Sequence, residues 1–537
     1  MKLKRSPHLF LTALLASAAT VFAAETKPNI LLILTDDIGW GDFQCYNPHG
    51  KIPTPNIDNL ARTGMKFTDA HTPAALCSPT RYSMLTGNYP WRGRAANGVW
   101  DFDGGTYFLP GQQTIGHLLQ ASGYRTAMFG KINVGGVFEH VGDTREVDWT
   151  KPMTSGPIQW GFEYSYISSG GHALPPFLFL ENNRVAGDPA KVMQLKKKRL
   201  PGGGMIPQDG PGLPDFDSSK IGELLATRAA AFLDDHLAKN KAAGEARPFY
   251  MHFCTDGIHN PWTPADTLLG HPLKGASKMT AHTDMVIETD ILLGALVGAL
   301  EQRGLLADTL IVFTSDNGGQ PFEREFGHDA VGGLRGCKSF IYEGGHRVPF
   351  LVRWGDGTTA GSKIPPGSVS RQLIGTHDTV ATFAELAGVK PGANQAVDSV
   401  SLLPVLRGDD RPVRQHLLIQ GSPNRDALAE PLPEPGQSYV AAYAAVGRNY
   451  IAAHAAVATK GKPAKSPSDH MPHALREGAW KLTLNIADQP AALHNLDEDL
   501  AEQKNLIAEP LQAERVKRME QLYRKLRAAK RTVPVHE

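Results

Sequence analysis

Four oxygen-bearing side chains occur as two pairs that each follow a strand-like stretch of the chain. Asp36 and Asp37 come directly after residues 29–35, an apolar run that is typical of a buried strand. Asp316 and Asn317 follow another such run. Three carboxylates and an amide oxygen form a hard ligand set, which suits Ca²⁺ or Mg²⁺ and not zinc. An Asp pair alone can be a helix cap or a turn, but the two pairs together predict one metal site.

Three cationic side chains and one histidine are candidates for binding and converting a substrate. They are Arg81, Lys131, Lys338 and His259. With a divalent metal, the three carboxylates and three cations leave a pocket of net positive charge, so we expect an anionic ligand. Any one cation could be a structural ion-pair partner, and it is their convergence that favours a functional site.

Cys77 begins the most informative segment of the chain. It reads Cys-Ser-Pro-Thr-Arg at 77–81 and continues with Leu-Thr-Gly at 85–87. This segment resembles the C-x-P-x-R signature of the formylglycine-dependent sulfatases, arylsulfatase-like enzymes of the alkaline phosphatase superfamily. Further stretches that resemble landmarks of this family occur in the family's order over nearly the whole chain: Asp36-Asp37, Gly130-Lys131, His259-Asn260-Pro261, Asp316-Asn317-Gly318-Gly319 and Lys338.

The resemblance implies a cofactor and a modification. In the family, the cysteine corresponding to Cys77 is oxidised before folding to an aldehyde, formylglycine, so a maturation enzyme would be a partner of this chain. Asp36, Asp37, Asp316 and Asn317 would hold a single metal ion, with the modified Cys77 as a further ligand. We expect Ca²⁺ in preference to Mg²⁺, because its flexible coordination accommodates this fifth ligand and a sixth from the substrate.

The resemblance also implies a mechanism for hydrolysing sulfate monoesters. A hydrated aldehyde is a geminal diol, and one hydroxyl, ionised with help from the metal and Arg81, attacks sulfur to form a covalent sulfate ester. His259 or Lys338 can protonate the departing alcohol. The second hydroxyl then loses its proton and expels sulfate, a step that an ordinary serine lacks the hydroxyl to perform.

Asn133 departs from the family pattern. The family has a histidine two residues after the lysine corresponding to Lys131, where it assists the second step as a base. An asparagine cannot accept a proton near neutral pH. Either Asn133 orients the diol while another group such as His140 acts as the base, or turnover is impaired.

Two other functions compete with a sulfatase. The first is a phosphomonoester or phosphonate hydrolase on the related alkaline phosphatase scaffold. Its two-zinc forms need additional histidine ligands, but Asn317 follows Asp316, and Lys338 fills the region of a second metal. The second is an inactive relative that binds sulfated glycans, if Cys77 is never oxidised. Retention of the cysteine, the cations and all four metal ligands argues against it.

Strands that alternate with helices must position these residues. Apolar stripes at helical spacing within 221–237 and 286–300 predict helices. The alternation predicts an α/β fold with a large, mostly parallel sheet flanked by helices, and functional groups just beyond the carboxyl ends of its strands. Short runs rich in β-branched and aromatic residues predict the buried strands: 29–35, 124–129, 249–254, 310–314 and 350–354.

The chain is too long for one hydrophobic core, since it has 537 residues. We expect a catalytic sulfatase domain over 25–404 and a smaller C-terminal α+β subdomain over 405–537. The chain beyond about Pro404 looks polar and irregular as far as a strand at 480–484, and a charged helix is expected at 508–529.

Residues 1–24 have the pattern of a secretory signal peptide. Lys2, Lys4 and Arg5 precede an apolar run that ends in small residues. That run is shorter than the roughly 20 residues that span a bilayer, and no later segment is a candidate. We therefore expect an exported protein, periplasmic or extracellular, without a transmembrane segment.

The overall charge of the chain is too close to neutral to attract a polyanion such as nucleic acid. The 55 Lys and Arg residues nearly balance the 54 Asp and Glu residues, so nucleic acid is not expected to bind.

Four cysteines are too few for a disulfide framework, and their spacing assigns no pair. The expected partners are a sulfated small molecule or glycan and the maturation enzyme; a sulfated carbohydrate is expected by family analogy.

Overall fold

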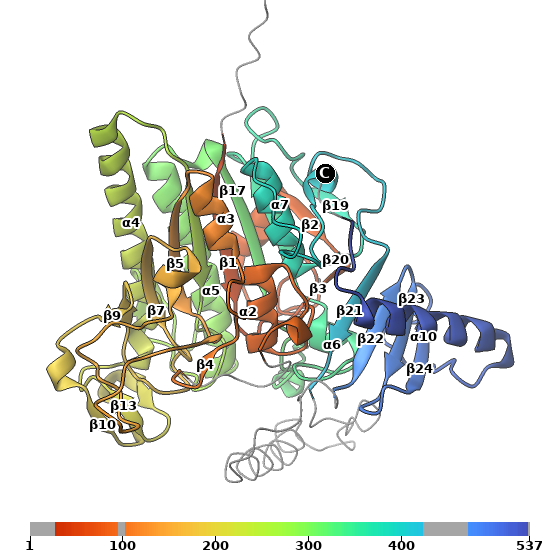
Figure 1. The fold of residues 1–537 in the computed structure, drawn as a ribbon, viewed down its shortest axis with the longest axis horizontal. Coiled ribbons are helices and arrows are strands. Elements are labelled where there is room, and N and C mark those ends of the chain that lie inside the picture. Colours follow the sequence, from red (N-terminus) through yellow and green to blue (C-terminus); the bar gives the residue numbers. More distant parts are fainter. Residues whose placement is uncertain (1–26, 95–101, 423–470, 535–537) are drawn as a thin grey trace, which may run out of the picture.

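A ten-stranded mixed sheet forms the centre of the protein (Figure 1). The computed structural model describes residues 27–94, 102–422 and 471–534. In spatial order the strands are β19 (Ser368–Ser370), β2 (Met65–Phe67), β18 (Phe350–Trp354), β17 (Thr309–Ser315), β1 (Asn29–Thr35), β14 (Phe249–Cys254), β5 (Arg125–Lys131), β7 (Tyr164–Ser168), β8 (Leu180–Glu181) and β9 (Arg184–Val185).

The middle of the sheet is parallel and its edges are mixed. β17, β1, β14, β5 and β7 are parallel neighbours, whereas β18, β8 and β9 pair antiparallel with theirs. The parallel strands are buried on both faces, which explains their nearly continuous apolar sequences. Their carboxyl ends therefore meet at one edge of the sheet.

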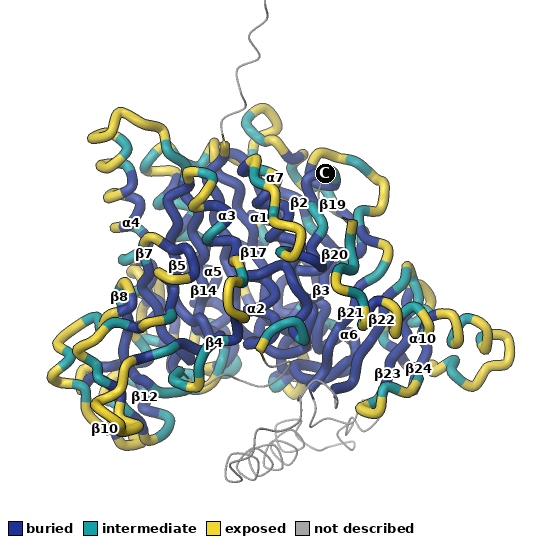
Figure 2. The backbone as a smooth tube through the Cα atoms, in the orientation of Figure 1, coloured by how far each residue is buried: buried dark blue, intermediate teal, exposed yellow. Residues whose placement is uncertain are grey.

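Side chains of β1 alternate between two hydrophobic cores. Ile30, Leu32 and Leu34 face one core, and Leu31 and Ile33 face the other. The first core is covered by α2 (Cys77–Thr86), α3 (Ile115–Ala121), α7 (Thr379–Leu386) and α8 (Leu403–Leu406). The second is covered by α1 (Pro55–Thr63), α4 (Ile221–Ala243) and α5 (Ala281–Gln302). Figure 2 shows the strands as the buried centre between these layers.

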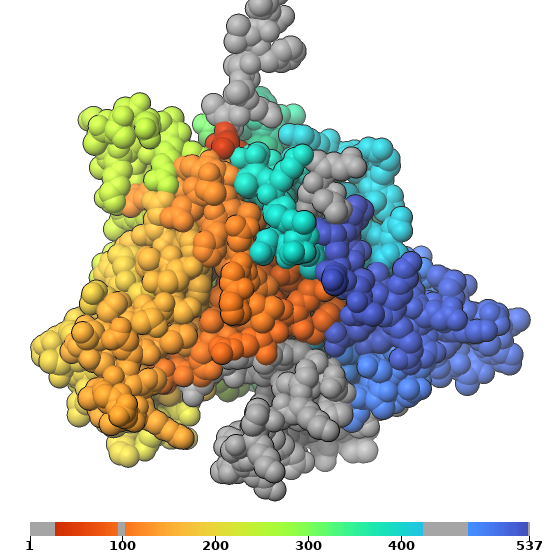
Figure 3. Space-filling model, viewed as in Figure 1, coloured from red at the N-terminus to blue at the C-terminus, as the bar shows by residue number. Residues whose placement is uncertain are grey.

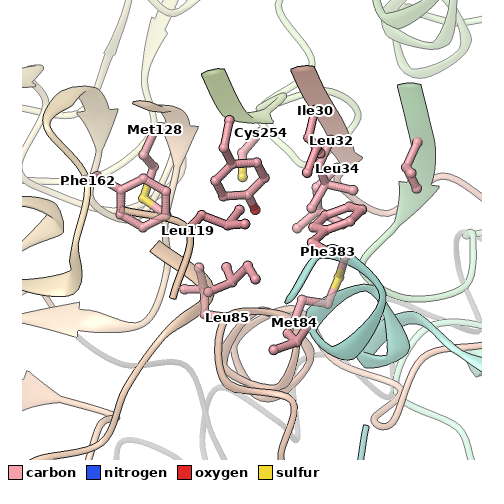
Figure 4. Packing of buried hydrophobic residues seen from close by; sticks show 14 of the residues in the cluster. Ile30, Leu32, Leu34, Met84, Leu85, Leu119, Met128, Phe162, Cys254 and Phe383 are labelled. Carbon is pink, nitrogen blue, oxygen red and sulfur yellow. The ribbon is translucent and has the colours of Figure 1, made fainter. Parts of the chain in front are cut away.

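Helix α2 is anchored on the first core by two adjacent side chains. Met84 and Leu85 belong to the core that contains the β1 residues, and Figure 4 shows Met84 beside Phe383 of α7 and Leu85 below Leu119 of α3. All ten residues of α2 are buried. The helix is thus fixed over the sheet, with its first residue near the carboxyl ends of the strands.

A four-stranded antiparallel sheet forms a lobe beside the main body (Figure 3, blue). Its strands are β21 (His416–Gln420), β22 (His473–Glu477), β23 (Trp480–Leu484) and β24 (Pro490–Asn495). Helix α10 (Ala513–Ala528) covers it through Met519, Tyr523 and Leu526, which pack on strand residues such as Leu482 and Leu493. A small helix of the main body, α6 (Glu343–His346), contacts this lobe through ion pairs that are described below.

Five minor two-stranded pairs complete the part of the fold that the structure describes. They are β3 (Ala70–His71) with β20 (Ile374–Gly375), β4 (Gly105–Thr106) with β6 (Gly135–Gly136), β10 (Met193–Leu195) with β13 (Gly210–Gly212), β11 (Lys198–Arg199) with β12 (Met205–Ile206), and β15 (Thr267–Leu268) with β16 (His271–Pro272). Among the described residues, no helix combines the length and the apolar composition that crossing a membrane requires.

The predicted fold class is confirmed, and some predicted boundaries change. The large sheet and the smaller C-terminal α+β lobe are both present. Lys131, expected just after its strand, is the last residue of β5. The chain beyond Pro404 is less irregular than predicted, because it contains β21 and β22. The boundary between 404 and 405 stays a prediction, and the predicted signal peptide lies outside the described residues.

Candidate active site

Strand register brings the two pairs of ligand candidates together. Thr35 of β1 is the parallel partner of Ser315 of β17, so Asp36 and Asp316 leave neighbouring strands at the same level. The Asp37 backbone N–H donates to Asp316 Oδ1 at 3.2 Å, which ties the second carboxylate into the group. Ligand atoms of Asp36, Asp37 and Asp316 all lie within 4.8 Å of one another, so this group could hold a metal ion.

The loop after β17 is pressed against the segment around α6. A Cβ on Gly318 would lie 1.9 Å from the Gly344 carbonyl oxygen, so only glycine permits this approach. Asn317 is thereby held beside Asp37, to whose Oδ1 its Nδ2 donates at 2.9 Å. This close packing against Gly344 explains why a glycine, Gly318, follows the predicted ligands Asp316 and Asn317.

The spacing of Cys77 and Arg81 follows from helix geometry. Cys77 is the first residue of α2, and Arg81, four residues later, lies on the same helical face. Pro79 sits in the first turn, where its missing N–H costs no helical hydrogen bond. The Arg81 Nε donates to Asp316 Oδ2 at 2.8 Å and Nη1 donates to the Lys131 carbonyl at 2.7 Å. Cys77 therefore starts its helix directly beside the carboxylate group.

Each carboxylate of the group has its own cation. Lys131 Nζ contacts Asp36, Lys338 Nζ contacts Asp37, and Arg81 contacts Asp316. The burial of all these side chains strengthens their electrostatic interaction. The three predicted cations thus surround the three predicted acidic ligands.

The electrostatics of the carboxylate group favour the binding of a cation. Burial opposes ionisation of Asp36, but Lys131, His259 and Arg81 together hold its pKa well below the usual range. Burial and the neighbouring Asp36 charge raise the pKa of Asp316 above its usual range. Asp36 Oδ1 and Asn317 Oδ1 are buried without a hydrogen-bond partner, which is costly for polar oxygens. A hard divalent cation would satisfy both oxygens and stabilise the ionised form of Asp316.

Cys77 is a buried thiol, and Asn133 contacts its sulfur. Burial raises the pKa of the Cys77 thiol above its usual value, so an unmodified side chain stays protonated and is a poor nucleophile near neutral pH. Asn133 Nδ2 lies 3.1 Å from Cys77 Sγ, and Asn133 Oδ1 is buried without a partner. Asn133 has a φ of 50°, a left-handed conformation that asparagine tolerates.

His259 stands at the more open side of the site. It is half-buried, whereas every other predicted site residue is buried. Its Nδ1–H donates to the Asn260 carbonyl at 2.8 Å, which leaves Nε2 as the free nitrogen. Burial and then the charges of Lys131 and Lys338 lower the pKa of His259 to about 3, so the imidazole is neutral here.

All ten predicted site residues are brought together by these contacts, and their catalytic roles stay predictions. His140 is different: it pairs with Asp103 at 2.7 Å in a partly exposed position, whereas Asn133 is the residue that reaches Cys77. Sequence reasoning missed Asp256, which is buried at 4% exposure and bonded to Ser168 Oγ. A lone aspartate two residues beyond a strand carries no distinguishing signal.

A second group of potential ligands has a different character. His71, Glu343 and His346 are also close enough to hold a metal ion. Lys481 Nζ lies 2.9 Å from His346 Nε2 and 3.1 Å from Glu343 Oε1, and Arg476 Nη1 lies 3.1 Å from His71 Nε2. No ligand atom of this group is a buried atom without a partner, unlike Asp36 Oδ1 and Asn317 Oδ1 of the first group, so we interpret it as a structural ion network.

Comparison with known proteins assigns the chain to a family. The sequence profile described as "Sulfatase" matches residues 28–389. An N-acetylgalactosamine-6-O-sulfatase of Bacteroides thetaiotaomicron is 29% identical over 434 residues, which cover 75% of this chain and 81% of that protein. Human arylsulfatase A is 32% identical over 424 residues, covering 76% and 74% of the two chains.

Solved structures show the same fold. One from a study of glycosaminoglycan metabolism by Bacteroides thetaiotaomicron superimposes with a TM-score of 0.72 at 24% identity, covering 94% of this chain and all of that one. The profile match spans more than half of this chain, and the human relative exceeds 30% identity. The chain therefore belongs to the sulfatase family and is a sulfuric ester hydrolase.

Proposed function

We propose that this sulfatase acts on sulfated carbohydrates, with Cys77 converted to formylglycine and one Ca²⁺ held by Asp36, Asp37, Asp316 and Asn317. The observation that supports this most is the position of Cys77. It begins a buried helix between the carboxylate group and Asn133, and its thiol is protonated by burial. A protonated thiol in this position would be a poor nucleophile, whereas an oxygen nucleophile would have the Asn133 amide and nearby cations as hydrogen-bond donors.

The bound groups supply the reactive chemistry. Formylglycine would provide a hydrated aldehyde as the oxygen nucleophile, and Ca²⁺ would act as a Lewis acid beside it. Arg81, Lys131 and Lys338 provide the positive charge that binds and orients the sulfate anion. They are held by the carboxylates, so they need no reorganisation when the substrate binds.

The two residues expected to protonate the leaving alcohol differ in their protonation state. The Lys338 ammonium is a charged donor, because Asp37 outweighs the effect of burial and raises its pKa well above the ordinary value. His259 is neutral and its ring hydrogen on Nδ1 is bonded to the Asn260 carbonyl, so Nε2 can accept a hydrogen bond but has no proton to give. Asn133 can hold the nucleophile in place, because it donates through Nδ2 and can accept through its free Oδ1.

Similarity supports the substrate class. The bacterial relative is named for the 6-sulfate of N-acetylgalactosamine, and the structure at a TM-score of 0.72 comes from work on glycosaminoglycans. The positively charged pocket selects the sulfate group and does not select the alcohol. A panel of sulfated mono- and oligosaccharides against small aryl sulfates tests this part: turnover of aryl sulfates alone would refute it.

We also propose that the enzyme is exported to the periplasm or the extracellular space. The support is the signal-peptide pattern of residues 1–24. N-terminal sequencing of the protein from its native cells would give a mature start near residue 25. An intact Met1 in protein recovered from the cytoplasm would refute export.

The decisive experiment is the mass of the tryptic peptide 67–81 from natively produced protein, followed by sulfate release with and without a calcium chelator. We expect the mass of a peptide in which the Cys77 side chain has lost sulfur and gained an aldehyde oxygen, and sulfate release that depends on calcium. A Cys77→Ala variant should keep the fold and lose turnover. Unmodified cysteine in fully active enzyme would overturn the proposal.

A further inference from the structure

The short segment after β7 contacts several residues of the active site. β7 ends at Ser168, which is the parallel partner of Lys131 on β5. The carbonyl of the next residue, Ser169, accepts a hydrogen bond from the Asn133 backbone N–H at 2.9 Å. Gly171 lies against the Lys131 side chain, because a Cβ there would be 3.0 Å from Lys131 Cδ. The segment therefore packs along one side of the active site.

His172 follows directly and bonds to the backbone of His259. Its side chain is buried, and its Nε2 lies 2.7 Å from the His259 carbonyl oxygen. A carbonyl oxygen can only accept a hydrogen bond, so Nε2 must carry the hydrogen and donate it. The bond joins two separate loops, because His172 follows β7 and His259 follows β14.

Asp256 lies beside the other nitrogen of the His172 ring. Its Oδ2 is 3.9 Å from His172 Nδ1, and both side chains are buried. Asp256 also accepts a hydrogen bond from Ser168 Oγ at 3.3 Å, which ties the carboxylate to the end of β7. A carboxylate at this distance attracts the imidazole through a medium of low dielectric constant. Asp256 thus favours the ring orientation in which Nε2 points to the His259 carbonyl.

Hydrogen bonds fix His259 on both sides of its backbone and at its ring. The His259 N–H donates to the Asp256 carbonyl at 3.2 Å, and the His259 carbonyl accepts from His172. The ring donates through Nδ1 to the Asn260 carbonyl at 2.8 Å, so only Nε2 is left to meet a substrate. The charges of both lysines of the site act on this ring. Its orientation matters for turnover, because a small displacement of a group that acts on the substrate can lower the rate strongly.

We propose that His172 is a positioning residue that fixes the His259 ring with its Nε2 toward the bound sulfate ester. The inference deepens the proposed function, because it rests on the action of His259 on the substrate. His172 acts through its hydrogen bond to the His259 carbonyl, and Asp256 keeps it in place for that bond. Loss of the bond should reduce turnover and leave the affinity for the sulfate group, which the cations of the site bind.

The test compares His172→Phe and His172→Gln with the unaltered enzyme on 4-nitrophenyl sulfate, with kcat normalised to formylglycine content. Phenylalanine keeps a ring but has no donor, so we expect kcat to fall about tenfold, the effect of one lost hydrogen bond, and KM to stay within about twofold. Glutamine offers an amide N–H near the position of Nε2 and should recover most of kcat. Unchanged kcat in His172→Phe would overturn the inference.

A double substitution tests whether His172 acts through His259. In the His259→Ala background, His172→Phe should lower kcat no further, because the ring that it positions is gone. A general structural role would lower kcat by the same factor in both backgrounds, and that result would overturn the inference. If His172→Phe does not fold, His172→Ala replaces it in each comparison.

A matched control is His117→Phe on α3. His117 Nε2 also lies 3.0 Å from a backbone carbonyl, that of Gln159, so the same substitution removes the same kind of hydrogen bond. The control should leave both kcat and KM unchanged.

A second measurement does not depend on turnover. In protein labelled with ¹⁵N at histidine, the His259 ring signals can be identified by their absence in His259→Ala. They should show a hydrogen on Nδ1 in the unaltered enzyme and a mixture of tautomers in His172→Phe, and identical signals in the two proteins would overturn the inference. If the unaltered enzyme does not cleave 4-nitrophenyl sulfate, the proposed formylglycine chemistry is wrong, and the tautomer measurement still decides the role of His172.

Discussion

At the scale of a single residue, Asn133 is placed to hold the proposed nucleophile at position 77. Its Nδ2 reaches the sulfur of Cys77 and its Oδ1 has no partner, so it can both donate to and accept from a diol that replaces the thiol. It cannot take up a proton near neutral pH. The side chain therefore suits positioning, and the second step needs its base from elsewhere.

Replacing Asn133 tests this role. We expect Asn133→His to leave kcat unchanged or raise it, because imidazole keeps a donor and adds a base. Asn133→Ala should lower kcat by about tenfold, the usual effect of one lost hydrogen bond. Steady-state kinetics on 4-nitrophenyl sulfate, normalised to the formylglycine content of each variant, measures kcat for the histidine and the alanine variant. A large loss in the histidine variant would show that the amide has a role of its own.

The sequence predicts site residues that stand in a pattern better than isolated ones. Cys77 and Arg81 are recognisable because their spacing matches one helical turn, and Asp36 and Asp316 because each follows a buried strand. Asp256 carries no such signal, because a single aspartate shortly after a strand is common. Only the structure shows that Asp256 is buried and bonded to Ser168 of the neighbouring strand β7, within the electrostatic reach of Lys131.

At the scale of elements, the carboxyl ends of β1 and β17 create the ligand group. The two strands run parallel in register, so the residues that follow them place three acids in one buried position. Such a concentration of charge is unfavourable without a cation, as the raised pKa of Asp316 indicates. Bound metal should therefore stabilise the fold as well as the active state.

Removing the metal tests this coupling. We expect a calcium chelator to abolish sulfate release and to lower Tm, and added Ca²⁺ to restore both more effectively than Mg²⁺. At a hundredfold excess over its Kd, the ion should contribute about 2.7 kcal/mol of stability. Scanning calorimetry of the Asp316→Asn variant should show a smaller response to Ca²⁺. The exposed Asp234→Asn serves as control, and a chelator without effect on activity or Tm would refute the metal site.

The contact between the main body and the C-terminal lobe depends on one buried lysine. Lys481 of β23 lies 3.1 Å from Glu343 Oε1 of α6 and 2.9 Å from Glu502 Oε1, and all three side chains are fully buried. Burial alone would raise the pKa of Glu343, but Lys481 above all other cations holds it well below the usual range. Glu502 therefore relies on this ammonium group, whereas Glu343 shares it with Arg347, whose Nε donates to Glu343 Oε2 at 2.8 Å.

Lys481→Met should destabilise the protein by about 3–5 kcal/mol, because it removes the cation that is paired with the buried Glu502 and one of the cations around the buried Glu343. Urea denaturation followed by fluorescence measures the change. Adding Glu502→Gln to the variant should recover part of the loss. Lys525→Met, an exposed lysine on α10, is the matched control and should change stability by no more than about 0.5 kcal/mol. Equal midpoints for Lys481→Met and wild type would contradict this account.

Across the whole molecule, the sequence predicts the main sheet well and the C-terminal lobe poorly. Four of the five parallel strands are visible locally as predicted apolar or β-branched runs, whereas β7, which reads Tyr-Ser-Tyr-Ile-Ser, is not among the predicted strands. β21 and β22 are short and contain polar residues, and their pairing joins His416 with Glu477 across a long sequence separation. Such a pairing depends on tertiary contacts, which no local pattern encodes.

Buried histidines give the molecule as a whole a predictable response to acid. Burial lowers the pKa of His71 and of His377 to about 4 and that of His252 to about 3, and all three side chains are almost completely buried. In the unfolded chain each would titrate near pH 6.5. Between these values the unfolded state binds more protons than the folded state, so the free energy of unfolding must fall as pH falls.

We therefore expect the histidine contribution to Tm to be lost as the pH falls from about 6.5 towards 4, with each histidine contributing up to about 1.4 kcal/mol per pH unit. The buried Glu288 acts in the opposite direction, because burial raises its pKa to about 8 and its contribution to stability is lost as the pH rises through that value. Calorimetry at constant ionic strength and saturating Ca²⁺ measures this, since a bound ion would otherwise dissociate over the same range. His377 Nε2 lies 3.0 Å from the Asp398 carbonyl, a hydrogen bond that a glutamine amide can replace. His377→Gln should accordingly lower the dependence of Tm on pH by the contribution of one histidine. A Tm that does not change between pH 7 and pH 5 would show that these histidines can be protonated within the folded protein.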